Sequence, residues 1–259
     1  MFSNFSMKPL TNQPLLQARD LMLTYAGSES PAVNSVSFTL FPDEFCGLIG
    51  PNGAGKTTLI SLFTTLLRPQ QGALVIGGID ARANPAAVRR KIGLVPQDIA
   101  LYDRLTGCEN IAYFGRMYGL KGADLLERSE YYLEMFGLRD RRNRLVATYS
   151  GGMKRRINLI VGLIHEPELL FLDEPTVGID AQSRHLIMER LAALNSEGMA
   201  MVYTSHYLEE VQRLCRRVAI IDGGRIVAEG TPAQLVAQAE GCEDLSALYL
   251  KKTGEHLRE

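Results

Sequence analysis

The sequence lacks a long apolar run, a surplus of positive charge and a signal peptide. A membrane-spanning helix needs about 20 consecutive apolar residues, whereas the longest apolar segments, "TTLISLFTTLL" and "INLIVGLI", are clearly shorter. The formal net charge is -1, so no nucleic-acid partner is expected, because such a partner would need a local basic patch. The N-terminal stretch has neither the basic start nor the apolar centre of a signal peptide. We therefore expect a chain with no membrane span of its own.

Cysteine is scarce as well, and no two cysteines form a Cys-x-x-Cys pair. A zinc site or a disulfide framework is therefore not expected, and a reducing cytosol suits the chain best. The Asn-Lys-x-Asp motif with which a GTPase reads its base is also absent. The four scattered cysteines are Cys46, Cys108, Cys215 and Cys242.

What the sequence does contain is a series of short apolar segments, which predicts an α/β fold with a mostly parallel sheet. Residues 20–25 and 35–40 alternate apolar and polar side chains, as in the antiparallel strands of an N-terminal β subdomain. The last apolar segment, "RVAIID", continues into a hairpin that turns at Gly223-Gly224. The segments predicted as strands of a buried, mostly parallel sheet are "FCGLIG", "ALVIGG", "KIGLVPQ", "ELLFLD", "MAMVYTS" and "RVAIID".

Residues 98–157 differ in character from the rest of the chain. They carry amphipathic helical patterns, such as "DLLERSEYYLEMFGL", and no strand signal, so we predict an inserted all-helical subdomain. It interrupts one large domain over residues 16–236. Residues 1–15 are predicted to be a flexible N-terminus, and residues 237–259 a short helical and polar tail that frays.

A phosphate-binding loop occupies residues 50–57, "GPNGAGKT", between a predicted strand and a predicted helix. Its backbone N–H groups and the helix N-terminus suit phosphate oxygens. Lys56 is placed to neutralise the β- and γ-phosphates, and the Thr57 hydroxyl to ligate Mg²⁺. The motif alone predicts a P-loop core that binds a nucleotide. The residues predicted to contact this nucleotide, which the resemblance described below identifies as ATP, are Gly50, Pro51, Asn52, Gly53, Ala54, Gly55, Lys56, Thr57 and Thr58.

The second half of such a site is "LLFLDE", a strand that ends in two carboxylates. Asp173 is predicted to emerge beside the phosphate loop and to hold Mg²⁺ through water. Glu174 is predicted to be the carboxylate that polarises the attacking water. In the alternative interpretation, this is merely an acidic strand end capped by the helix that follows Pro175.

The octet "YSGGMKRR" places a serine and two glycines at the start of an apolar helix. Ser150 offers its hydroxyl to an anion, or N-caps its own helix, or does both. The octet resembles the Leu-Ser-Gly-Gly-Gln-x-Gln-Arg signature of the ATP-binding-cassette ATPases, and the resemblance runs from about residue 16 to residue 236. Ser150, Gly151 and Gly152 are intact, whereas the usual Leu, Gln and second Gln are replaced by Tyr149, Met153 and Arg155.

This resemblance assigns roles to four further residues, each with an ordinary alternative. Tyr25 would stack on adenine, or be a cross-strand core tyrosine. Gln97 would touch Mg²⁺ and water and sense a membrane partner, or be a polar strand end. Asp180 would contribute to the ATP site across a dimer interface, or N-cap the next helix, or both. His206 would contact the γ-phosphate and orient the catalytic water, or be structural.

The resemblance also implies how the chain works. The catalytic residues would be Glu174, His206, Lys56 and Gln97, and the Mg²⁺ ligands Thr57, Gln97 and Asp173. ATP would be sandwiched in a homodimer between the phosphate loop of one copy and residues 150–152 of the other. Closing and opening of this dimer would drive an integral membrane permease subunit, so that the chain would be cytoplasmic and peripheral on the inner face of the cell membrane.

The segments "GPNGAGKTT" and "TVGID" are most similar to bacterial exporter ATPases of the daunorubicin-resistance and multidrug type. An importer ATPase, a non-transport member of the same superfamily and a soluble kinase are the alternatives. The basic run at residues 139–144 would meet a membrane partner or acidic lipid, or form a solvated basic face.

Overall fold

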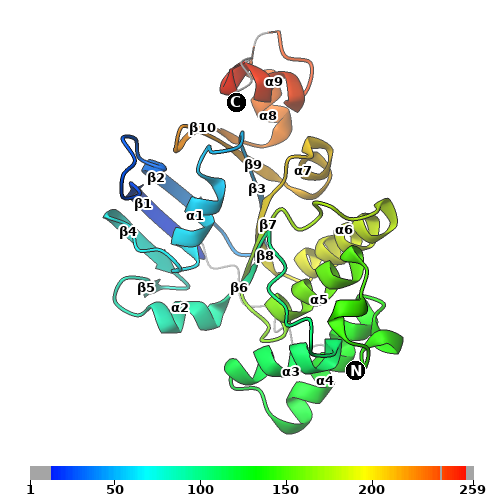
Figure 1. Ribbon diagram of the computed structural model, residues 1–259. Helices are drawn as coiled ribbons and strands as arrows, with labels where there is room; N and C mark the ends of the chain where they lie inside the picture. The colour runs from blue at the N-terminus through cyan, green and yellow to red at the C-terminus, as the bar shows by residue number, and fades with distance from the viewer. Residues whose placement is uncertain (1–12, 240, 255–259) are drawn as a thin grey trace.

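The computed structural model describes residues 13–239 and 241–254, and their strands fall into two sheets (Figure 1). The smaller sheet has the order β2-β1-β4-β5 and is antiparallel throughout, as the alternating N-terminal segments predicted. Its strands are β1 (Leu16–Leu23), β2 (Val33–Leu40), β4 (Gln71–Ile76) and β5 (Ile79–Asp80).

The segment "ALVIGG" was wrongly predicted to belong to the parallel sheet. It lies in β4 and pairs with β1. Only Leu74 and Ile76 of β4 are fully buried, whereas every residue of β3, β7 and β8 is buried. A strand of an antiparallel sheet buries one face, and a central parallel strand buries both. Apolar content alone did not distinguish the two.

The larger sheet has the order β10-β9-β3-β8-β7-β6, and all its pairs are parallel except the β9–β10 hairpin. This confirms the mostly parallel sheet of the predicted α/β fold. The carboxyl ends of β3, β6, β7 and β8 therefore meet at one edge, where binding sites of parallel sheets form. The strands are β3 (Phe45–Ile49), β6 (Ile92–Val95), β7 (Leu169–Asp173), β8 (Ala200–Thr204), β9 (Arg217–Asp222) and β10 (Arg225–Gly230).

Helix α1 (Lys56–Phe63) lies between the two sheets (Figure 1). The ring of Phe63 is 5.5 Å from that of Phe38 on β2 and 6.0 Å from that of Phe171 on β7. One apolar cluster thus joins both sheets to α1 and holds this helix between them. The other helices of the α/β part are α2 (Pro85–Lys91), α6 (Ala181–Ser196) and α7 (Leu208–Leu214).

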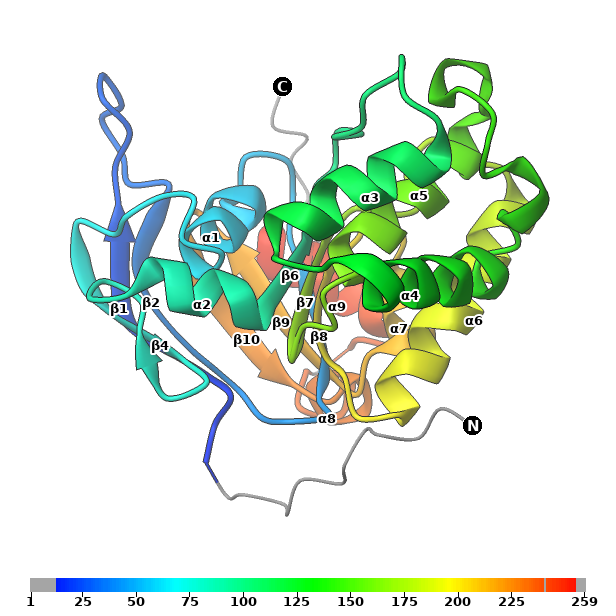
Figure 2. The ribbon, with the colours of Figure 1, turned by 90° about the horizontal axis from the view of Figure 1, so that it is seen from below.

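Between β6 and β7 the chain forms the predicted helical subdomain, with α3 (Gly107–Met117), α4 (Gly122–Met135) and α5 (Gly151–Leu163). Figure 2 shows α3 and α4 gathered on the side of the molecule away from β1, β2 and β4. A capping box formed by Thr106 and Glu109 starts α3. An apolar cluster then continues from this subdomain into the large sheet.

After β10 the chain forms two helices, α8 (Pro232–Ala237) and α9 (Leu245–Thr253). Leu245 and Leu248 are buried in the main core, so α9 is docked on it. The expected fraying beyond the helical part of the tail stays a prediction. Two apolar side chains at helical spacing suffice to dock so short a helix. Residues 1–12 of the predicted flexible N-terminus and residues 255–259 lie outside the described residues. Within the described part of the chain, no helix has the length and apolar character required to cross a membrane.

Candidate nucleotide site

The phosphate loop connects β3 to α1 in the predicted strand–loop–helix arrangement. Gly55 has a φ of 105°, and a Cβ there would lie 2.3 Å from the Ala32 carbonyl oxygen, so only glycine fits. Gly53 has a φ of 76°, and a Cβ there would meet no described atom within 4 Å. No side chain of the described residues caps the N-terminus of α1. The loop therefore offers open space at Gly53 and a helix N-terminus without a side-chain cap, where phosphate oxygens would bind.

Lys56, the first residue of α1, is hydrogen-bonded to this loop. Its Nζ donates hydrogen bonds to the carbonyl oxygens of Gly50 and Pro51, at 2.8 and 3.0 Å. Burial lowers the pKa of the ammonium, and the charges of Glu174 and Asp173 oppose that shift. The Lys56 ammonium thus contacts the loop and is within electrostatic reach of both carboxylates. Its role toward the β- and γ-phosphates stays a prediction.

Asp173 and Glu174 lie at the carboxyl end of β7 and are both buried. The Thr204 hydroxyl donates to Oδ1 of Asp173 at 2.7 Å and accepts from the Glu174 N–H at 2.9 Å. Glu174 has a φ of 49°, a left-handed conformation that costs about 1–3 kcal/mol in a residue other than glycine. Such strain is typical of functional sites. The alternative role of Asp173 and Glu174 as a plain helix cap does not explain these contacts.

His206 reaches Glu174 directly. It follows β8, the neighbour of β7, and its Nε2 lies 2.5 Å from Oε1 of Glu174. The carboxylate is 6% exposed and the imidazole 38% exposed. The structure therefore brings together the residues predicted to be the general base and its histidine partner, with the imidazole open to solvent.

Gln97 follows β6 and is exposed. Because Val95 of β6 pairs with Leu172 of β7, Gln97 lies at the same sheet edge as the two carboxylates. Sequence reasoning missed how its loop is fixed: Nη1 of Arg155 donates to the Pro96 carbonyl oxygen at 3.0 Å. Burial lowers the pKa of the Arg155 guanidinium, against the charges of Asp98 and Glu174.

Asn158 assists Arg155 one helical turn further along α5. Its Oδ1 accepts from the Ala100 N–H at 3.3 Å, so α5 holds both ends of the Gln97 loop. The sequence signal that could have found these contacts is the spacing of Arg155 and Asn158. They are polar residues at i and i+3, in and just before the apolar run "INLIVGLI".

Tyr25 is 48% exposed, so the alternative of a buried core tyrosine is wrong. Its hydroxyl lies 3.2 Å from Oγ1 of Thr58, in the first turn of α1. A ring next to the phosphate loop and open to solvent is available for stacking on a base.

Ser150 is the N-cap of α5, where its Oγ accepts from the Met153 N–H at 3.3 Å. It is exposed, and its helix α5 lies on the other side of the large sheet from α1 (Figures 1 and 2). The unusual Tyr149 is buried and donates to the Arg141 carbonyl oxygen at 2.8 Å, while Met153 packs against the core. The replacements Tyr149 and Met153 therefore serve packing, whereas the third, Arg155, contacts the Gln97 loop.

The two glycines of the octet have different surroundings. A Cβ at Gly151 would lie no closer than 3.7 Å to a neighbour. A Cβ at Gly152 would lie 2.2 Å from Oγ of Ser183 and 3.1 Å from Oδ2 of Asp180. Asp180 itself N-caps α6 by accepting from the Ser183 N–H at 2.8 Å, which lowers the pKa of its carboxyl. Close packing of α5 on α6 is thus one reason for glycine at position 152, besides its predicted role at phosphate.

Replacing Gly152 by alanine should therefore destabilise the protein by about 1–3 kcal/mol, the usual cost of overpacking. Gly151→Ala, the matched control, should leave the free energy of unfolding nearly unchanged. Thermal unfolding of both variants measures this difference. Equal melting temperatures would show that the contact with Ser183 is unimportant.

The remaining histidines and the basic run lie outside the site. His165 contacts the Ile92 carbonyl oxygen at 2.8 Å and stacks on Tyr118, which is a structural role. His185 pairs with Glu189 on the surface of α6, and His256 lies outside the described residues. In the basic run, Arg139 and Arg142 pair with Glu130 at 3.1 and 3.3 Å. These pairs favour a solvated basic face.

Comparison with known proteins identifies the family. Residues 33–177 match the family described as ABC transporter. The chain is 46% identical over 227 residues to the linearmycin resistance ATP-binding protein LnrL of Bacillus subtilis, covering 88% of this chain and 72% of that protein. It is 43% identical over 216 residues to the doxorubicin resistance ATP-binding protein DrrA of Mycobacterium tuberculosis, covering 83% of this chain and 65% of that protein.

Solved structures agree with this assignment. One described as the ATP binding subunit of an ABC transporter superposes with a TM-score of 0.84 at 31% identity, covering 93% of this chain and all of that chain. Another, an ATP-binding cassette in a dimeric post-hydrolysis state with ADP and Pi, has a TM-score of 0.77 at 25% identity and covers 83% of this chain and 98% of that chain. The chain belongs to the ABC transporter family, among its ATP-hydrolysing ATP-binding proteins.

Proposed function

We propose that this chain is the ATPase subunit of an exporter of drugs or other small molecules. The observation that carries the proposal is the 46% identity to a linearmycin resistance ATP-binding protein, together with the 43% identity to a doxorubicin resistance protein. Lys56, Glu174 and His206 are all present at the sheet edge, and this supports active hydrolysis rather than ATP binding alone. The alternative of a soluble kinase does not account for residues 150–152.

At the nucleotide site of each copy of the chain, residues 50–58 would hold the phosphates of ATP, and Tyr25 would stack on its base. Bound Mg²⁺ would neutralise phosphate charge. The residues that fit it are Thr57, Asp173 and Gln97, which offer a hydroxyl, a carboxylate and an amide oxygen at one end of the sheet. Glu174 would accept the proton of the attacking water, and His206 would orient that water. Lys56 would offset negative charge that develops on the phosphates.

The second half of each site would come from another copy of the chain. Ser150 and Gly151 are exposed at the N-terminus of α5, a helix end that attracts anions. Helix α5 lies on the other side of the large sheet from α1, the helix that follows the phosphate loop (Figure 1). A two-fold dimer would therefore place residues 150–152 of one copy, followed by its Asp180 loop, over the ATP of the other. The dimeric arrangement of a related ATP-binding cassette supports this assembly.

The motion of such a dimer would be transmitted to a separate integral membrane permease at the inner face of the cell membrane. Gln97 is suited to this coupling because its loop is held by α5, the helix that begins with residues 150–152. No nucleic-acid partner is proposed. An importer is the closest alternative, since the direction of transport depends mainly on the membrane subunit.

Purification of the tagged chain from detergent-solubilised membranes of its own organism tests the proposal. An integral membrane protein should co-purify, and doxorubicin or linearmycin should stimulate the ATPase activity of the complex. With ATP, inside-out membrane vesicles should accumulate the compound if the complex exports, whereas an importer would not concentrate it there. A chain that co-purifies with no membrane protein would contradict the proposal.

A further inference from the structure

Glu210, on α7, is a buried carboxylate for which the reaction described above has no use. It is 4% exposed, and one of its oxygens, Oε2, accepts three hydrogen bonds from hydroxyl groups. The donors are the hydroxyls of Tyr203 at 2.6 Å, Thr176 at 2.8 Å and Ser205 at 2.9 Å. Burying a charge is costly unless hydrogen bonds satisfy it in this way. Three hydroxyl donors on one oxygen therefore suggest a specific role for Glu210.

The three hydroxyls belong to the two segments that carry the reacting groups. Thr176 follows Glu174 by two residues, and Ser205 immediately precedes His206. The Ser205 hydroxyl also accepts from the Tyr207 N–H at 2.9 Å, so both neighbours of His206 are fixed. A single carboxylate oxygen thus joins the Glu174 segment to the His206 segment. The contact of 2.5 Å between Glu174 and His206 depends on how these two segments are placed.

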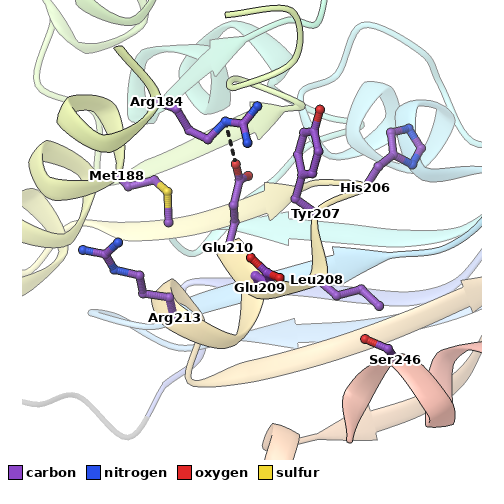
Figure 3. Close-up of a pocket in the computed structure, with 9 residues that line it drawn as sticks. All are labelled: Arg184, Met188, His206, Tyr207, Leu208, Glu209, Glu210, Arg213 and Ser246. Atoms are coloured by element: carbon purple, nitrogen blue, oxygen red, sulfur yellow. Dashed lines mark ion pairs between the residues drawn. The ribbon is translucent and has the colours of Figure 1, made fainter. Parts of the chain in front are cut away.

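The other oxygen of Glu210 faces α6. Oε1 lies 3.5 Å from Nε of Arg184, and neither atom has a hydrogen-bond partner among the described residues. Figure 3 shows Arg184 extending from α6 toward Glu210 in an open pocket, with Tyr207 beside it. The guanidinium of Arg184 lies 4.4 Å from the centre of the Tyr207 ring.

Arg184 in turn belongs to the helix that Asp180 caps. Its N–H donates to the Asp180 carbonyl oxygen at 3.0 Å, in the first turn of α6. Asp180 is the residue expected to lie at the interface between two copies. The chain of contacts therefore runs from the expected interface, through Arg184 and Glu210, to the segments of His206 and Glu174.

We propose that Glu210 is a positioning residue for ATP hydrolysis. Glu210 sets the contact between Glu174 and His206, and through Arg184 it links this contact to the Asp180 loop. The inference rests on the proposed roles of Glu174 and His206. An ionised carboxylate accepts hydrogen bonds at every lone pair, whereas a glutamine amide accepts at one atom only and donates at the other. Glu210→Gln therefore keeps the shape of the side chain but removes the charge that faces Arg184.

The test compares Glu210→Gln with Glu209→Gln, which makes the same change at the exposed neighbouring residue. Glu210→Gln should lower kcat for ATP by about 10- to 100-fold, the effect of a misplaced reacting group, and should change KM by less than about threefold. Glu209→Gln should have the kcat of the unmodified protein. Thermal unfolding confirms that both variants are folded at the assay temperature.

A double-mutant cycle with His206→Ala distinguishes positioning from a general structural role. If Glu210 acts through His206, Glu210→Gln should cause no further loss of the residual single-turnover rate in the His206→Ala protein. Independent, multiplying losses would overturn the proposal, as would an unchanged kcat for Glu210→Gln. If His206→Ala by itself reduces turnover, the proposed role of His206 in hydrolysis stands even where the prediction for Glu210 fails.

Discussion

Replacing Glu174 by glutamine is expected to give a protein that binds MgATP, barely hydrolyses it and accumulates as an ATP-bound dimer. The amide has the shape of the carboxylate but cannot accept the proton of the attacking water, a loss that costs about 10²- to 10⁴-fold in rate. Glu174 is 5% exposed, so no bulk water replaces it as a base at that position. Because ATP would hold the two copies together, blocked hydrolysis should trap the dimer.

Steady-state ATPase assays and size-exclusion chromatography with MgATP measure the two parts of this prediction. Glu189→Gln is a suitable control, because Glu189 is half exposed on α6 and pairs with His185. It should have ordinary turnover and no trapped dimer. Wild-type turnover of Glu174→Gln would show that another group acts as the base.

The phosphate loop and the two carboxylates were predictable because their geometry is local. A buried strand followed by a glycine-rich loop and a helix fixes where Lys56 lies. Likewise, a strand of four apolar residues must deliver Asp173 and Glu174 to the carboxyl edge of a parallel sheet. The α/β fold followed from the same short apolar segments, although their apolar content placed the segment of β4 in the wrong sheet.

The features that sequence reasoning missed depend on contacts between distant segments. Nothing local distinguishes Glu210 from its exposed neighbour Glu209, because only the fold brings three hydroxyls to one of them. The hydrogen bond from Arg155 to the Pro96 carbonyl oxygen joins residues 59 positions apart. The contact of Gly152 with Ser183 likewise requires α5 to pack on α6.

Replacing Ser150 by arginine is expected to abolish turnover while leaving ATP binding by the monomer intact. Ser150 is exposed at the N-terminus of α5, where a long cationic side chain would fill the space that the phosphates of the partner's ATP need. Loss of the N-cap bond to Met153 costs about 1 kcal/mol of stability. Ser150→Ala loses the same cap without the bulk, so it should show the same small fall in melting temperature and keep much of its turnover.

Mixing two inactive variants tests the assignment of Ser150 to the partner's site. A dimer of one Ser150→Arg copy and one Glu174→Gln copy contains one site with both faults and one site with neither, provided that Ser150 acts across the interface. Each mixed dimer should therefore recover one of its two sites. If Ser150 served the phosphate loop of its own chain, every site would carry one fault and mixing would restore nothing. Recovered ATPase activity in the mixture, absent from either variant alone, is thus the result that only a composite site predicts.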